Sequence, residues 1–122
     1  MIVFTILVFG LLSKIYAQDP GKLTYVDVSV PEFKELMENE NTVIIDVRTP
    51  AEARSGVIEG AQVINIFSTN FKKKVSELPR DKTYLVYCRS GHRSVIACKK
   101  MNKLGFKNLY NLMGGYTSWK KN

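Results

Sequence analysis

Cysteine and histidine are scarce in this 122-residue chain, which contains two cysteines, Cys88 and Cys98, and one histidine, His92. With so few sulfur and imidazole side chains we expect no metal site, because such sites need a cluster of ligands at defined spacing. The cysteines lie ten positions apart, so they do not form the C-x-x-C pair of a disulfide oxidoreductase. We expect both thiols to be free, because a helix beginning after Cys88 would keep the two Cα atoms beyond bridging distance.

Long apolar runs are also scarce. The longest covers residues 2–12, which is too short to cross a bilayer and close in length to the apolar core of a signal peptide. The small residue Ala17 suits the position before a cleavage site. We therefore predict a signal peptide over residues 1–17, cleavage before Gln18, and a single domain over residues 18–122. The protein is then exported to a periplasmic or extracellular location, without stable membrane insertion after cleavage; an uncleaved N-terminal membrane anchor is the alternative.

Acidic side chains are outnumbered, with 11 Asp and Glu against 18 Lys and Arg, which gives a formal net charge of +7. The basic residues are scattered and form no stripe interleaved with aromatic residues, so we expect no nucleic-acid partner. A positive surface instead raises the local concentration of small anions. Small anionic substrates are therefore the class that the charge favours. The sequence carries no indication of the oligomeric state.

Apolar and amphipathic segments alternate along the rest of the chain. Residues 42–47 and 83–88 are continuous apolar runs, typical of parallel strands that are covered on both faces. Ser29 and Thr49 each stand three positions before a glutamate, which is the spacing of a helix capping box. These patterns predict an α/β fold, a three-layer sandwich with a mostly parallel five-stranded sheet and helices on both faces. We expect strands over residues 23–29, 42–47, 61–66, 83–88 and 108–112, and helices over residues 29–39, 49–54, 68–79, 94–105 and 114–121.

One cysteine follows a predicted central strand and precedes a predicted helix, in the segment CRSGHRS, residues 88–94. Gly91 permits the sharp turn that this connection needs, and a turn entering a helix aims successive N–H groups at one point. A helix N-terminus alone stabilises an anion by about 0.3–1 kcal/mol, which lowers a pKa by less than one unit at ~1.36 kcal/mol per unit. Several converging amides and the arginines are needed to hold Cys88 as a thiolate, or to hold the charge of a persulfide one atom farther out.

Three segments of the chain resemble the single-domain rhodanese (thiosulfate sulfurtransferase-like) family: IIDVRTPAEARSGVIEGAQVINI, the cysteine loop CRSGHRS, and LMGGYTSWK. The resemblance implies a rhodanese-like fold and transfer of sulfane sulfur from a donor such as thiosulfate to a thiophilic acceptor. Sulfur would pass through a persulfide on Cys88, with no cofactor, and with a thiol, cyanide or a protein as acceptor. The chain departs from the family at three positions: Val57 and Glu59 stand where histidine and proline are frequent, and Tyr116 stands where tryptophan is common.

The resemblance also assigns roles to the residues around the catalytic Cys88. Arg93 would bind the anionic donor, and the other side chains of the loop would line the mouth of the site. Asp46 and Arg48, which follow the neighbouring strand, would support the cysteine loop rather than react. The substrate-binding set that the resemblance implies is Arg89, Ser90, Gly91, His92, Arg93 and Ser94.

Two other interpretations stay open. Cysteine phosphatases and arsenate reductases use a similar loop with five residues between the cysteine and the arginine, whereas four separate Cys88 from Arg93. The shorter loop suits one added sulfur better than a tetrahedral phosphate, and no aspartate offers itself clearly as the general acid. The second alternative is a module of the same fold that carries sulfur or binds a partner without turnover.

Overall fold

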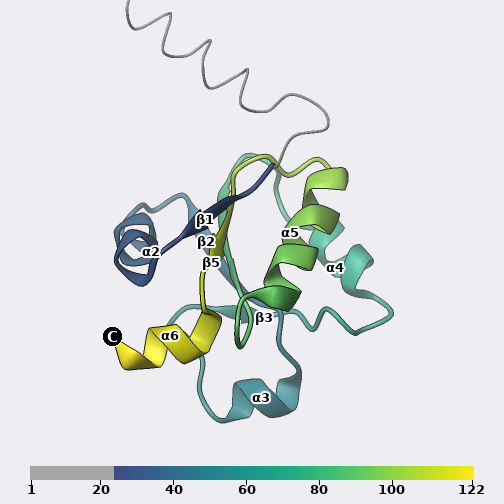
Figure 1. Cartoon of the computed structure of the whole chain (residues 1–122). Helices are drawn as coiled ribbons and strands as arrows, with labels where there is room; N and C mark the ends of the chain where they lie inside the picture. Colours follow the sequence, from purple (N-terminus) through teal and green to yellow (C-terminus); the bar gives the residue numbers. More distant parts are fainter. Residues whose placement is uncertain (1–23) are drawn as a thin grey trace, which may run out of the picture.

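The computed structural model describes residues 24–122, so the predicted signal peptide and its cleavage site lie outside the described residues. Strands and helices alternate through this part of the chain (Figure 1). No helix within it combines the length and hydropathy needed to cross a membrane. Nor do three or more His, Cys, Asp or Glu side chains of these residues gather in a group that could hold a metal ion. The elements are β1 (Val26–Val28), α2 (Val30–Met37), β2 (Thr42–Asp46), α3 (Pro50–Arg54), β3 (Gln62–Val63), α4 (Phe71–Ser76), β4 (Thr83–Tyr87), α5 (His92–Lys103), β5 (Leu109–Leu112) and α6 (Gly115–Lys121).

The five strands form one sheet in the order β1-β5-β4-β2-β3. Every neighbouring pair is parallel, which confirms the predicted α/β sandwich and makes its sheet parallel throughout. The two central strands, β2 and β4, pair from Thr42 opposite Thr83 to Asp46 opposite Tyr87. Their carboxyl ends are therefore level, and the polar residues that follow them emerge at the same edge of the sheet.

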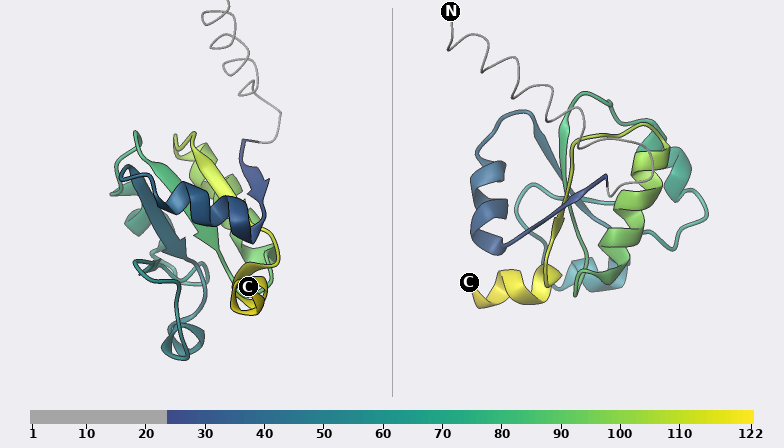
Figure 2. Two further views of the ribbon diagram at one scale, coloured as in Figure 1. Left: turned by 90° about the vertical axis from the view of Figure 1, so that its left-hand side faces the viewer. Right: turned by 45° about the horizontal axis from the view of Figure 1, so that its top comes forward.

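Side chains along β4 alternate between two apolar cores. Leu85 and Tyr87 pack in the core on the side of α2 and α6. Tyr84, Val86 and the following Cys88 pack in the core on the side of α4 and α5. The views in Figure 2 show these helix pairs on opposite faces of the sheet. Burial on both faces explains why the strand is composed of large apolar and aromatic residues after Thr83.

Both predicted capping boxes are present. The hydroxyls of Ser29 and Thr49 accept from the amides of Glu32 and Glu52, and each glutamate carboxylate accepts from the backbone N–H of its cap residue. Each box satisfies amides that have no partner within the helix. Local sequence therefore determines where α2 and α3 begin.

Several element boundaries differ from the prediction. Helix α5 begins at His92, two residues earlier than expected, because Gly91 is itself the N-cap, with a left-handed φ of 100°. Strand β3 covers only two residues. The chain nevertheless stays beside β2 for a few more residues, because the amide of Ile64 donates to the Asp46 carbonyl and the amide of Ile66 donates to the Val47 carbonyl. A turn at Asn65–Ser68 then leads the chain away from the sheet and delays α4.

Candidate functional site

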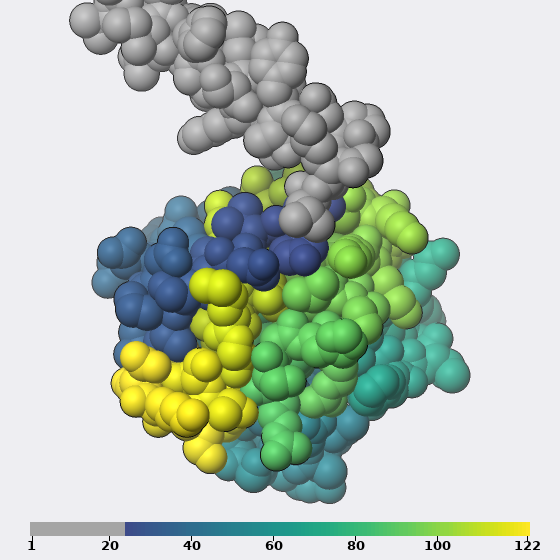
Figure 3. All heavy atoms as spheres, viewed as in Figure 1, coloured from purple at the N-terminus to yellow at the C-terminus, as the bar shows by residue number. Residues whose placement is uncertain are grey.

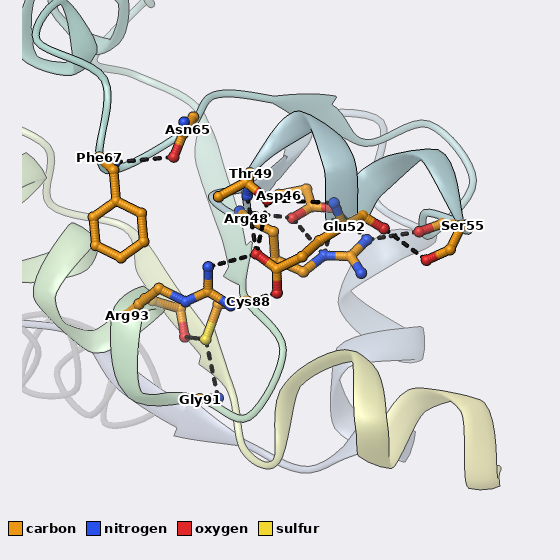
Figure 4. Close-up of polar contacts among 12 residues, drawn as sticks. Asp46, Arg48, Thr49, Glu52, Ser55, Asn65, Phe67, Cys88, Gly91 and Arg93 are labelled. Carbon is orange, nitrogen blue, oxygen red and sulfur yellow. Dashed lines mark hydrogen bonds and ion pairs between the residues drawn. The ribbon is translucent and has the colours of Figure 1, made fainter.

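Cys88 directly follows β4 at the carboxyl edge of the sheet and begins the loop that leads into α5. The left-handed conformation of Gly91 folds this loop back over the end of the strand. The Gly91 N–H thereby donates to Cys88 Sγ, at a distance of 3.0 Å (Figure 4). The thiol points at the loop amides, yet the residue is wholly shielded from solvent, with 0% of its surface exposed.

The environment of Cys88 favours the thiolate. Burial alone would raise the pKa of the thiol, because the charged form loses hydration. Hydrogen bonds from the Ser94 hydroxyl and from the amides of Ser94, Gly91 and Ser90 outweigh burial, so the pKa lies below that of an ordinary cysteine. Donors from the loop and from the first turn of α5 therefore stabilise negative charge on the sulfur.

Cys98 provides the contrast within α5. Both cysteines are free and buried, which confirms the expectation that they do not form a disulfide. Burial raises the pKa of the Cys98 thiol to about 12, with smaller effects from the charges of Asp27 and Cys88. Cys98 belongs to the apolar core beside α4, where burial disfavours the thiolate.

A chain of hydrogen bonds runs from the buried Cys88 through the buried Ser94 and Asn111 to the exposed Asp27 on the first strand. Ser94 Oγ lies 3.4 Å from Cys88 Sγ and donates to Asn111 Oδ1 on β5. Asn111 Nδ2 in turn donates to Asp27 Oδ1 on β1, at 2.9 Å. Because a carboxylate only accepts hydrogen bonds, Asp27 fixes the amide with its oxygen toward Ser94. A serine hydroxyl has one proton, so Asn111 and the Cys88 thiolate compete for it.

Arg93, in the first turn of α5, is engaged by Glu52. The two terminal guanidinium nitrogens donate to the two carboxylate oxygens, each at 2.7 Å (Figure 4). These hydrogen bonds lower the pKa of Glu52 to about 2. The same hydrogen bonds raise the pKa of Arg93, and the nearby Cys88 thiolate adds to that rise. The side chain predicted to bind the donor is therefore neutralised by Glu52, close to the sulfur.

Three polar side chains of the loop are exposed at the surface: Arg89, Ser90 and His92. The loop backbone is held from below by α6, because the amides of Tyr116 and Thr117 donate to the carbonyls of Cys88 at 2.8 Å and Arg89 at 3.0 Å. This contact requires glycine at the start of α6. A Cβ on Gly115 would lie 2.5 Å from the Cys88 carbonyl oxygen.

Asp46 and Arg48, which are expected from the sequence to support the cysteine loop, make their side-chain hydrogen bonds instead to each other, to Tyr87 and to the segment that follows α3. Arg48 donates to the Asp46 carboxylate over 2.6–3.0 Å and to the Gly56 carbonyl at 2.6 Å. The Tyr87 hydroxyl completes the cluster by donating to Asp46 at 2.8 Å. The Arg48 guanidinium also lies 4.4 Å from the centre of the Tyr116 ring. Support therefore reaches the cysteine loop indirectly, through Tyr87, which directly precedes Cys88, and through Tyr116, whose amide donates to the Cys88 carbonyl.

Three side chains near the sulfur are not indicated by any sequence pattern. The spacing around Glu52 predicts only a helix cap, and no motif includes Asn111 or Asp27. Glu52 and Arg93 are 41 positions apart, and Asn111 and Asp27 are 84 positions apart. Only the order of the strands brings these partners together, so no local spacing could have indicated them.

Comparisons with known proteins agree with this geometry. The Rhodanese-like domain family matches residues 29–122, which include the cysteine loop. A sulfurtransferase of Allochromatium vinosum is 35% identical over 86 residues, which cover 70% of this chain and 78% of that protein. The thiosulfate sulfurtransferase GlpE of Pseudoalteromonas translucida is 27% identical over 97 residues, 80% of this chain and 90% of that protein. The crystal structure of a rhodanese-related protein from Thermoplasma volcanium is similar with a TM-score of 0.70 and 30% identity, and the similarity covers 80% of this chain and 92% of that one.

Proposed function

The chain belongs to the rhodanese family, and from this premise we propose that it transfers sulfane sulfur from a donor such as thiosulfate to a thiophilic acceptor through a persulfide on Cys88. Relatives named as sulfurtransferases support sulfur transfer in general. One observation carries the finer proposal: the Gly91 amide donates to Cys88 Sγ at 3.0 Å. Sulfur held by such donors is a nucleophile as the thiolate and a stable carrier as the charged persulfide.

The reaction consists of two displacements at sulfur. The Cys88 thiolate attacks the outer sulfur of thiosulfate, the S–S bond of the donor breaks, and sulfite leaves with the electron pair. Cys88 then carries the outer sulfur as an anionic persulfide. The acceptor attacks that outer sulfur, the bond from it to Sγ breaks, and the electron pair returns to Cys88 as the thiolate. Both steps balance without an oxidant or a reductant.

Access of the donor involves the Glu52–Arg93 pair. Cys88 is shielded from solvent, and both terminal nitrogens of Arg93 are occupied by Glu52. The oxygens of thiosulfate offer the guanidinium the same two-point acceptor as a carboxylate. The donor takes the place of Glu52 on Arg93, and this exchange opens the path to the sulfur.

The test is a pair of measurements on the purified protein. With thiosulfate and cyanide, thiocyanate is expected to form at a rate that depends on protein concentration. With thiosulfate alone, mass spectrometry is expected to find one added sulfur atom on Cys88. Cys88→Ser should abolish both signals, whereas the matched control Cys98→Ala, which leaves the loop donors in place, should keep both.

Three outcomes would favour another function. Release of phosphate from an aryl phosphate without formation of thiocyanate would indicate a cysteine phosphatase. No added sulfur on Cys88 would indicate a binding module. A persulfide that forms but passes its sulfur to neither cyanide nor thiols would indicate a carrier without turnover of its own.

A further inference from the structure

A cationic pocket opens beside the cysteine loop. Its volume is about 470 Å³, which lies within the range of small-molecule sites, roughly 300–1,000 Å³. Thiosulfate, with five heavy atoms, would fill only a small part of it. The lining residues are Arg48, Glu52, Ser55, Arg89, Tyr116, Thr117, Lys120 and Lys121.

The free charge of this pocket is positive. Arg48 is neutralised by Asp46, and Glu52 is neutralised by Arg93. The remaining cations are Arg89, Lys120 and Lys121, and neither ion pair found in residues 24–122 includes any of them. They leave three positive charges on the wall of the pocket without an acidic partner among these residues.

Residues that line the pocket are hydrogen-bonded to the cysteine loop. Arg89 directly follows Cys88, and the first amides of α6 bond to the carbonyls of both residues. On the opposite wall, Glu52 holds Arg93 at the other end of the loop. In Figure 3, the yellow atoms of α6 adjoin the green atoms of the segment that leads into α5. Lys120 is also positioned against the site, with Nζ 5.8 Å from the centre of the Tyr116 ring.

We propose that this pocket binds the carboxylate groups of the acceptor, a small thiol that carries two or more carboxylates. The proposal rests on the proposed function and names the acceptor class for the same site. The acceptor is favoured over the donor because the pocket is much larger than thiosulfate and is lined by Arg89, the residue that directly follows Cys88. The acceptor thiol releases its proton to water, its thiolate attacks the outer sulfur, Cys88 leaves as the thiolate, and the product is the persulfide of the small thiol.

The experiment isolates the second displacement. The protein is loaded with sulfur by thiosulfate, the excess is removed, and loss of the persulfide is followed with mercaptosuccinate or with neutral monothioglycerol. The measured quantity is the rate with mercaptosuccinate divided by the rate with monothioglycerol. Comparing this ratio between variants cancels the different intrinsic reactivities of the two thiols.

The variant Lys120→Gln/Lys121→Gln is expected to lower the ratio by about threefold to tenfold, the effect of two partly screened ion pairs. The native ratio should also fall as salt increases, because the attraction is electrostatic. The matched control Lys73→Gln/Lys74→Gln removes the same charge on α4, outside the pocket, and should leave the ratio unchanged.

An equal fall in both double variants would mean that net charge, and not this pocket, selects the acceptor. An unchanged ratio in Lys120→Gln/Lys121→Gln would also overturn the proposal. Failure of thiosulfate to load Cys88 at all would contradict the proposed function instead, so the two failures are distinguishable.

Discussion

Replacing Asn111 by leucine is expected to lower the pKa of the Cys88 thiol, because the change removes the competitor for the Ser94 proton. In the native protein Ser94 donates to Asn111 Oδ1 and lies 3.4 Å from Cys88 Sγ. Ionisation of the thiol requires the hydroxyl proton to turn from the amide to the sulfur. Asn111 is only 2% exposed, so water does not replace the hydrogen bond that its oxygen then loses.

The expected size of the shift follows from that one hydrogen bond. A bond between neutral groups contributes about 1 kcal/mol net. The substitution removes it from the thiol form alone, because the thiolate form has already given it up. At ~1.36 kcal/mol per pKa unit, the pKa of Cys88 should fall by about 0.7 unit. The amides of the loop remain, so the shift adds to the lowering that they cause.

The assay is the rate of alkylation of Cys88 by iodoacetamide as a function of pH, with mass spectrometry to separate it from Cys98. Shielding of the sulfur scales the rate at every pH and leaves the midpoint of the titration unchanged. The control is a double-mutant cycle: in a Ser94→Ala background, Asn111→Leu should no longer move the midpoint. Asn111→Ala, which is free of overpacking, should shift the midpoint in the same direction as Asn111→Leu.

A midpoint that rises, or stays unchanged, in a variant that melts like the native protein would refute the reasoning. Asn111 would then position Ser94 as a donor to sulfur, and no competition for its proton would exist. The distinction is informative because both arrangements keep the same heavy-atom contacts, and only the place of one hydrogen differs.

Three further predictions concern the support of the loop. Glu52→Gln keeps a cap for α3 but frees Arg93. Alkylation of Cys88 should therefore accelerate, and KM for thiosulfate should fall by up to about fivefold. A higher KM would mean that Glu52 aligns Arg93 for the donor. The pKa of Glu52 is lowered from 4.5 to about 2, so its contribution to stability is present above the unfolded value and is lost as pH falls through the folded one. In urea unfolding, the stability advantage of the native protein over Glu52→Gln should therefore vanish between about pH 5 and pH 2, and a constant difference would contradict this. Gly115→Ala should lower the free energy of unfolding by about 1–3 kcal/mol more than Gly60→Ala, and it should also slow persulfide formation. Both glycines have positive φ, but only a Cβ on Gly115 would collide with the Cys88 carbonyl. Equal effects of the two substitutions in thermal unfolding would exclude the collision.

Local patterns in the sequence determined the layers of the fold and the position of Cys88 at the carboxyl edge of the sheet. A strand with apolar residues on both faces must be covered on both sides, which makes residues 42–47 and 83–88 the centre of a parallel sheet. Capping boxes at Ser29 and Thr49 place two helix starts, since the atoms that form them lie within one turn. Gly91 can turn the chain where other residues are strained, so the loop around Cys88 can also be predicted from a few consecutive residues.

The tertiary structure alone decided which distant groups contact the residues around Cys88. Glu52 reaches Arg93, and Asn111 reaches Asp27, across 41 and 84 positions of sequence. These contacts depend on the strand order β1-β5-β4-β2-β3, which sets β1 beside β5 and brings the residues that follow β2 and β4 to one edge. Hydrophobic periodicity reports whether a side chain is buried, but it carries no information about which distant polar group it meets. Donors within six residues of Cys88 lower the pKa of its thiol, but the distant partners of Ser94 and Arg93 become visible only once the strands are in place.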